Sequence, residues 1–147
     1  MKFRHVSVVR VPMELAYDWW TSFSEEDGDE IGPLLSRRIL LGQERELLIE
    51  DEYRYLNRRL VLKGRVRIEP TDSYMVEYNG KMLRLSLKYM FAPLVEGTQL
   101  VVLGEVKGKG WLRFLLPLLW PRIRREIVEG VEGNVERVES LFQSDSS

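Results

Sequence analysis

Hydrophobic and polar residues alternate with a period of two through most of the chain between residues 38 and 107. The clearest case is residues 60–68, where Leu60, Leu62 and Val66 alternate with charged residues. A period of two is typical of strands, and one apolar and one charged face indicate an antiparallel sheet with one face in water. The predicted strands are residues 3–11, 38–41, 47–55, 59–69, 74–78, 82–91 and 98–107.

Turn residues separate these segments. Asn79-Gly80 predicts a two-residue type I′ hairpin turn, because both residue types tolerate positive φ. Leu56-Asn57 and Glu96-Gly97 are predicted to turn the chain as well. Residues 24–36 are acidic at first and then broken by Gly-Pro, so we expect a loop with at most one helical turn around residues 31–35.

Two segments have the helical period instead. Residues 13–23 follow Pro12 and carry apolar residues at helical spacing, which predicts a helix of about three turns. Residues 111–142 have apolar positions at steps of three and four. A helix of that length would extend roughly 45–50 Å and needs a broad apolar partner.

Prolines divide this last segment. Pro117 and Pro121 each remove a backbone donor, so residues 111–119 are predicted to form a kinked or separate turn before a regular helix from about Pro121 to Phe142. Gly130 and Gly133 each cost about 1 kcal/mol relative to Ala in a helix. We expect both to keep a cavity open or to allow close approach to a strand.

The order of elements predicts an α+β fold in which a curved antiparallel sheet of six to seven strands wraps around the long C-terminal helix, with one or two short helices after the first strand. A length of 147 residues suits one domain, predicted at residues 1–143 with a frayed tail at 144–147.

Composition narrows the function. The chain has no cysteine and one histidine, which excludes disulfides and argues against a metal site, and we expect no cofactor. Its net charge of −1 and the lack of a recognition motif argue against nucleic acid. The N-terminus does not resemble a signal peptide, and the longest apolar run, residues 114–120, is far below the roughly 20 residues of a membrane span. We expect a cytoplasmic protein.

Three stretches resemble the START/SRPBCC superfamily, whose fold is the helix grip. They are Val11 to Phe23, with Pro, Glu and an aromatic-Asp pair; Glu96 to Leu100, with a Gly-Thr turn; and Leu115 to Arg125, with a Leu/Pro-rich and then Arg-rich opening. The resemblance implies a hydrophobic cavity between sheet and helix. It implies no common reaction, because members bind lipids, sterols, quinones and polyketides and only some are enzymes.

The sheet face turned to the helix supplies the candidate site. It carries apolar residues and a few polar tips, which is the usual composition of a small-molecule pocket. Each tyrosine either orients the polar end of a ligand or is a wall residue. The predicted cavity residues are Asp51, Tyr53, Tyr55, Tyr74, Tyr78, Leu85, Leu87, Tyr89, Ile127 and Val131.

Asp51 and His5 are the candidates for proton transfer. A carboxylate at a core-facing strand position must be paired or have a raised pKa. Asp51 therefore acts on a ligand or is satisfied by a neighbour such as Arg38. His5 is the only imidazole in the chain, but a lone histidine on an N-terminal strand is more often packed or solvated.

The opening of the last helix carries a second cluster, Trp111, Phe114, Leu118, Trp120 and Arg122. Residues 107–125 hold six basic side chains and no acidic one, interleaved with apolar residues. Tryptophan, leucine and basic residues together are typical of a membrane interface. The alternatives are a homodimer interface or a plug packed on the tryptophans of the first helix.

The residues therefore predict a protein that binds or transports a hydrophobic small molecule or lipid, without catalysis of its own. A polyketide cyclase or aromatase is the first alternative, and a protein-interaction domain with a collapsed cavity is the second. The acidic residues 24–30 lack the ligand spacing of a calcium loop, so a solvated loop is expected there. A lid over the cavity is the alternative role for this loop.

Overall fold

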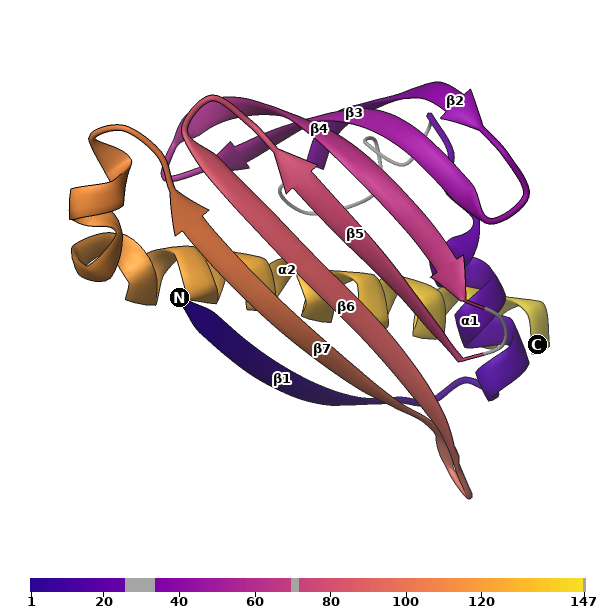
Figure 1. The fold of residues 1–147 in the computed structure, drawn as a ribbon. Helices are drawn as coiled ribbons and strands as arrows, with labels where there is room; N and C mark the ends of the chain where they lie inside the picture. The colour runs from indigo at the N-terminus through magenta and orange to yellow at the C-terminus, as the bar shows by residue number, and fades with distance from the viewer. Residues whose placement is uncertain (26–33, 70–71, 147) are drawn as a thin grey trace.

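The computed structural model describes residues 1–25, 34–69 and 72–146, and the side chains up to residue 143. It has the predicted α+β helix-grip fold, with seven strands, one short helix and one long helix among these residues (Figure 1). The elements are β1 Lys2–Val9, α1 Met13–Thr21, β2 Leu34–Gly42, β3 Glu46–Tyr55, β4 Arg58–Glu69, β5 Ser73–Asn79, β6 Leu83–Leu94, β7 Gly97–Gly108 and α2 Leu112–Ser146.

All strand pairs are antiparallel, and the strand order is β1-β7-β6-β5-β4-β3-β2. The first strand therefore lies at one edge, beside the last. Figure 1 shows the sheet curving around α2, which crosses its concave face along its whole length. None of the helices among the described residues is long and apolar enough to span a membrane.

Alternate strand residues face the helix, as the period of two predicts. In β4, Leu62, Gly64 and Val66 are buried, and the residues between them are exposed. The helix contributes Ile123, Ile127 and further residues at steps of three and four. At the apolar coefficient of about 25 cal/mol per Å², a buried side chain of this size contributes roughly 1.5–3 kcal/mol. This shared apolar interface holds helix and sheet together.

The long helix differs from its prediction at both ends. It is continuous from Leu112 through both prolines, and its opening turns, drawn in orange in Figure 1, are set at an angle to the rest. Residues 111–119 are thus a kinked part of one helix and not a separate turn. At the other end the helix extends past Phe142 to Ser146.

The second strand is longer than predicted. Leu34 and Leu35 begin β2, so the helical turn expected around residues 31–35 is wrong for these two residues. Residues 26–33, which include most of the acidic stretch, lie outside the described part of the chain.

The hairpin after β5 also differs. Asn79 remains in β5 opposite Arg84, and the turn is closed by Gly80 N–H donating to the Leu83 carbonyl oxygen at 2.9 Å. The type I′ prediction at Asn79-Gly80 is therefore wrong. Positive φ angles occur instead at Leu56 (56°) and Asn57 (61°), in the two-residue turn between β3 and β4.

Candidate functional site

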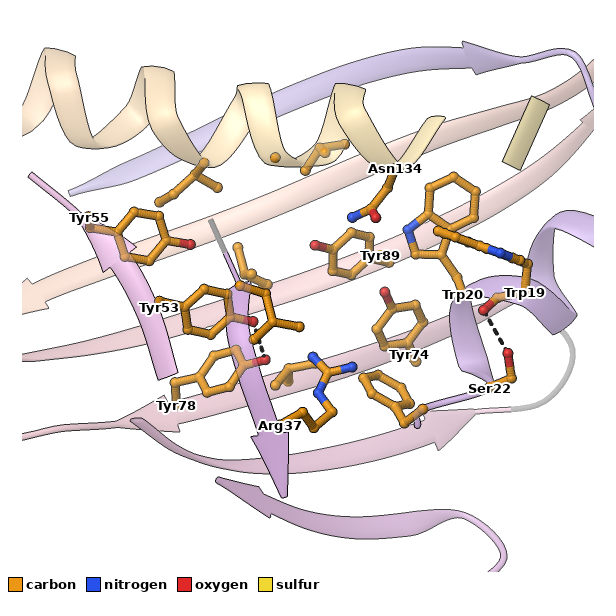
Figure 2. Close-up of a pocket in the computed structure, with 17 residues that line it drawn as sticks. Trp19, Trp20, Ser22, Arg37, Tyr53, Tyr55, Tyr74, Tyr78, Tyr89 and Asn134 are labelled. Atoms are coloured by element: carbon orange, nitrogen blue, oxygen red, sulfur yellow. Dashed lines mark hydrogen bonds between the residues drawn. The ribbon is translucent and has the colours of Figure 1, made fainter. Parts of the chain in front are cut away.

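A pocket of about 120 Å³ lies between the concave sheet face and α2. Figure 2 shows its wall of aromatic side chains from the sheet, with α1 at one end and α2 above. We call it the inner pocket. It is lined by Trp19, Trp20, Ser22, Phe23, Leu34, Arg37, Tyr53, Tyr55, Tyr74, Val76, Tyr78, Leu87, Tyr89, Ile127, Gly130, Val131 and Asn134.

An ion pair between Arg37 and Asp51 lies at the floor of this pocket. Arg37 Nε donates to Asp51 Oδ1 and Arg37 Nη2 to Asp51 Oδ2, both at 2.9 Å. The hydroxyls of Tyr53 and Tyr78 also donate to Oδ2, at 3.1 and 2.7 Å. Asp51 is fully buried, and four hydrogen bonds to its two oxygens offset the cost of burying its charge.

The register of β2 against β3 explains the pair. Arg37 lies directly opposite Asp51 in a regular part of the pairing, between the register shifts at Leu34/Ser36 and Ile39/Leu41, so the two side chains share the inner face. Arg38, the partner suggested by the sequence, points to the outer face and pairs with Glu50 at 3.6 Å. The correct partner was missed because the strand was predicted to begin at Arg38, which left Arg37 assigned to no face.

Tyrosines form the wall beside this pair. Tyr74 and Tyr89 are opposite each other on β5 and β6, and their rings stack with centroids 4.6 Å apart. Tyr53 stacks on Tyr55 at 5.4 Å. Gly64 makes room for Tyr78, because a Cβ at this glycine would lie 2.8 Å from the Tyr78 ring. The wall is therefore a set of rigid aromatic faces with hydroxyl tips.

Burial raises the pKa of these hydroxyls. It raises the pKa of Tyr89 to about 12, and the pKa values of Tyr53, Tyr55 and Tyr78 lie well above the ordinary value, with Asp51 adding to the effect of burial at all three. Burial alone would lower the pKa of Arg37, but its hydrogen bonds to Asp51 and its electrostatic interactions with Tyr78, Tyr53 and Asp51 together outweigh burial and raise the pKa. The pocket therefore holds neutral phenols and a neutralised ion pair at physiological pH.

These pKa values predict an alkaline limit to stability. Between about pH 10 and pH 12 the unfolded chain releases the Tyr89 proton while the folded protein keeps it, so folding loses free energy as the pH rises. The loss from Tyr89 alone is about 3 kcal/mol. We expect tyrosinate absorbance to rise together with loss of circular dichroism in this range. Tyr89→Phe should lose less stability over the same range, and buried tyrosines that ionise while the fold persists would contradict the prediction.

Two buried polar atoms of the inner pocket have no protein partner among the described residues: Trp20 Nε1 and Asn134 Oδ1. In Figure 2 the Asn134 amide points down from α2 on the side where the Trp20 indole lies. One atom is a donor and the other an acceptor, and a buried group without a hydrogen bond costs about 1–3 kcal/mol. A hydroxyl group can serve either atom, because it both donates and accepts hydrogen bonds.

A second pocket, of about 270 Å³, adjoins the first toward the start of α2. We call it the outer pocket. Tyr55 and Ile127 line both pockets. Along α2, Ile123 lies one turn before Ile127 and lines the outer pocket, whereas Val131 lies one turn after it and lines the inner pocket. The outer pocket reaches the surface at Trp111, which is half exposed under the guanidinium of an exposed arginine, Arg58. It is otherwise lined mainly by apolar side chains.

The structure places the predicted site residues in three groups. Tyr53, Tyr55, Tyr74, Tyr78, Leu87, Tyr89, Ile127 and Val131 line the inner pocket, and Leu85 lines the outer one. Asp51 lines neither and lies behind Arg37. His5 is also outside both pockets, where its Nε2 lies 2.6 Å from Glu132 Oε1 and ties β1 to α2.

The two helix glycines have different surroundings. Gly130 is buried and lines the inner pocket. Gly133 is exposed, and a Cβ there would meet nothing within 4 Å, so the prediction that it keeps space open is wrong. Among the described residues, no cluster of three or more His, Cys, Asp or Glu side chains could hold a metal ion.

Sequence reasoning missed two polar residues of the inner pocket, Arg37 and Asn134. Arg37 had a detectable signal, since it is two residues before the inward-facing Ile39. Asn134 is one residue before the buried Val135 and on the border of the apolar stripe, a position that gives no signal in the sequence.

Neither a family sequence profile nor a curated protein sequence matches the chain. Solved structures do. The ZhuI aromatase/cyclase from Streptomyces sp. R1128 has a TM-score of 0.82 at 14% identity, covering 95% of this chain and 93% of that one. A START superfamily protein from Mycobacterium smegmatis has 0.70 at 15%, covering 93% and 98%, and Ara h 8.0201 has 0.74 at 15%, covering 98% of both. The chain thus has the helix-grip fold of the START/SRPBCC superfamily.

Proposed function

We propose that this chain binds a hydrophobic small molecule or lipid between the sheet and α2. The observation that carries the proposal is the pair of adjoining pockets, about 120 and 270 Å³, which meet at Tyr55 and Ile127. Ligand sites usually occupy roughly 300–1,000 Å³, so one ligand would extend through both. The space favours a binding protein over a domain with a collapsed cavity.

The distribution of polar groups suggests how the ligand lies. The inner pocket has hydroxyls, one guanidinium and the unpartnered Trp20 Nε1 and Asn134 Oδ1, whereas the outer pocket is mainly apolar. A ligand with an oxygen at one end and an apolar body would gain hydrogen bonds at the first and bury hydrophobic area in the second. We infer that its polar end lies beside Trp20 and Asn134.

A cyclase-like reaction is the second candidate, favoured by the similarity of fold to an aromatase/cyclase. The two residues considered for proton transfer do not support it. His5 lines neither pocket, and Asp51 lies behind Arg37 with its oxygens already bonded. A ligand in the inner pocket would meet phenols and Arg37 instead, which position a molecule but are weak proton donors and acceptors at neutral pH.

Filling the inner pocket tests the proposal. Gly130→Leu should weaken binding of the hydrophobic dye anilinonaphthalene sulfonate at least about tenfold, because a leucine side chain would take up much of so small a pocket and one ordinary buried contact is worth about that factor. Binding is measured by the fluorescence of the dye in a titration. Leucine also has a higher helix propensity than glycine, and a thermal unfolding curve of the variant checks that it stays folded at the temperature of the titration.

Gly133→Leu is the matched control. It makes the same substitution on the same helix at an exposed position with open space around it, so dye affinity should be unchanged. Native mass spectrometry of the wild-type protein should also detect an organic molecule retained through purification, and Gly130→Leu should lose it. Equal dye affinity in the wild type and Gly130→Leu would contradict binding in the inner pocket.

A further inference from the structure

Large apolar side chains are exposed together on the opening turns of α2. Phe114 is 80% exposed and Leu118 78%, and Trp111 and Leu115 beside them are about half exposed. We call these four residues the apolar patch. Exposed apolar residues scattered singly need no explanation, but four within eight consecutive residues at the start of a helix are typical of a surface that contacts a partner or a membrane. The patch lies at the end of the molecule opposite α1 (Figure 1).

This position rules out one of the expected roles. A plug packed on Trp19 and Trp20 would need α1 nearby, and those two rings pack instead on each other and, through Trp20, on Phe91. Among the aromatic residues of the predicted cluster, Trp120 packs against the ring of Phe3 at a centroid distance of 6.0 Å. No described residue buries the four residues of the apolar patch.

Basic side chains surround the patch. Arg113, Arg124 and, from the β3–β4 turn, Arg58 are exposed and form no ion pair with any described residue. Lys109 donates to the side-chain oxygen of Asn79 and the carbonyl oxygen of Gly80, and neither acceptor carries a negative charge. Other basic residues of this region are neutralised, as Arg122 is by Glu126. The patch is therefore apolar at its centre and cationic at its rim, although the whole chain has a net charge of −1.

We propose that the apolar patch docks on the surface of an anionic lipid bilayer. Aromatic and leucine side chains would enter the boundary between headgroups and acyl chains, and the basic rim would contact the headgroups. A second copy of the chain is a poorer occupant. An isologous dimer would place the patch against itself and bring the unpaired arginines of both copies together.

The outer pocket reaches the surface at the same place. Trp111 belongs to the patch and also lines the outer pocket, together with Leu112 and Arg58. A bilayer in contact with the patch would therefore face the outer pocket through Trp111. The docking surface can be tested independently of the proposed ligand site, because Phe114 and Leu118 line neither pocket.

Flotation with phosphatidylcholine vesicles that contain phosphatidylserine tests the docking surface. The wild-type protein should float with these vesicles at low salt and much less with pure phosphatidylcholine or at high salt, because the basic rim is screened. Phe114→Ser combined with Leu118→Ser should lower the partition coefficient at least about hundredfold. Arg113→Gln should lower it about fivefold, since one basic residue contributes about 1 kcal/mol at an anionic surface.

Val95→Ser is the control, because Val95 is a fully exposed apolar residue in the turn between β6 and β7, about 35 Å away along the strand. It should float like the wild type. Wild-type protein that stays unbound at low salt would overturn the proposal. So would a wild-type dimer that becomes monomeric in the double variant, since the patch would then be a self-interface. Dye binding in the double variant should match the wild type, which separates this outcome from failure of the ligand site.

Discussion

Asp51→Asn should destabilise the protein by about 3–5 kcal/mol, the usual cost of removing one partner from a buried ion pair. The Arg37 guanidinium has almost no exposed surface, and Asp51 is its carboxylate partner through two hydrogen bonds at 2.9 Å. Without the negative charge, a buried cation remains uncompensated and the hydroxyls of Tyr53 and Tyr78 lose their strongest acceptor. The loss is measured as the change in the midpoint of urea unfolding, followed by tryptophan fluorescence.

Two further variants separate this effect from general damage to the sheet. Glu50→Gln breaks the neighbouring pair with Arg38 on the outer face of the same strands, and the change should be within about 1 kcal/mol because the pair is largely solvated. Arg37→Met combined with Asp51→Leu removes both charges and should recover most of the stability lost in Asp51→Asn. Equal effects of Asp51→Asn and Glu50→Gln would contradict a buried pair.

Gly97→Ala should cost about 3 kcal/mol or more. Gly97 has a φ of 149°, which side chains rarely adopt, and a Cβ there would lie 2.2 Å from the Val9 carbonyl oxygen. The next residue, Thr98, is fully buried and donates its hydroxyl to the Val11 carbonyl oxygen at 2.7 Å. Any shift of Gly97 therefore disturbs the point where the chain leaves β1 for α1. Thermal and urea unfolding measure the loss.

Gly110→Ala separates the two causes. Gly110 also has a positive φ, 56°, but nothing lies within 4 Å of its Cβ position. Alanine there should cost only the backbone strain, about 1–2 kcal/mol. If Gly97→Ala were no worse than Gly110→Ala, the contact with Val9 would not be what requires glycine at that turn.

Several features of the fold followed from the order of residues. The alternation in residues 60–68 fixed which side chains of β4 face inward, because the face of a strand residue depends only on its parity. The steps of three and four from Leu112 to Val138 identified the buried face of α2 for the same kind of local reason. Both predictions were confirmed. Such patterns are dependable because a shift of one residue would move the whole apolar set to the solvent-exposed face.

Local pattern failed at the ends of two strands. β2 begins at Leu34 and not at Arg38, so Arg37 lies within the strand on its inner face, opposite Asp51. The turn after β5 lies at Lys81 and Met82, two residues further along the chain than predicted, because Asn79 pairs with Arg84 in the sheet. In each case a contact made across the fold outweighed the local preference of the residue.

The inner pocket itself is a property of the tertiary structure. The sequence identified Tyr53, Tyr55, Tyr74, Tyr78 and Tyr89 as inward-facing residues of the sheet. It did not show whether each one contacts a ligand, another tyrosine or Asp51. Asp51 was expected at the site because its inward parity is visible, yet its oxygens are occupied by Arg37 and two tyrosines from distant strands.

The sequence by itself determined the helix-grip architecture, the inner and outer faces of the sheet, and the apolar and basic composition of the opening of α2. Only the tertiary structure decided that Asp51 is paired with Arg37, that Trp20 and Asn134 face the same pocket, and that Phe114 and Leu118 stay exposed. The reason is physical. Periodicity and parity are properties of neighbouring residues, whereas hydrogen-bond satisfaction and exposure depend on side chains brought together from distant parts of the chain.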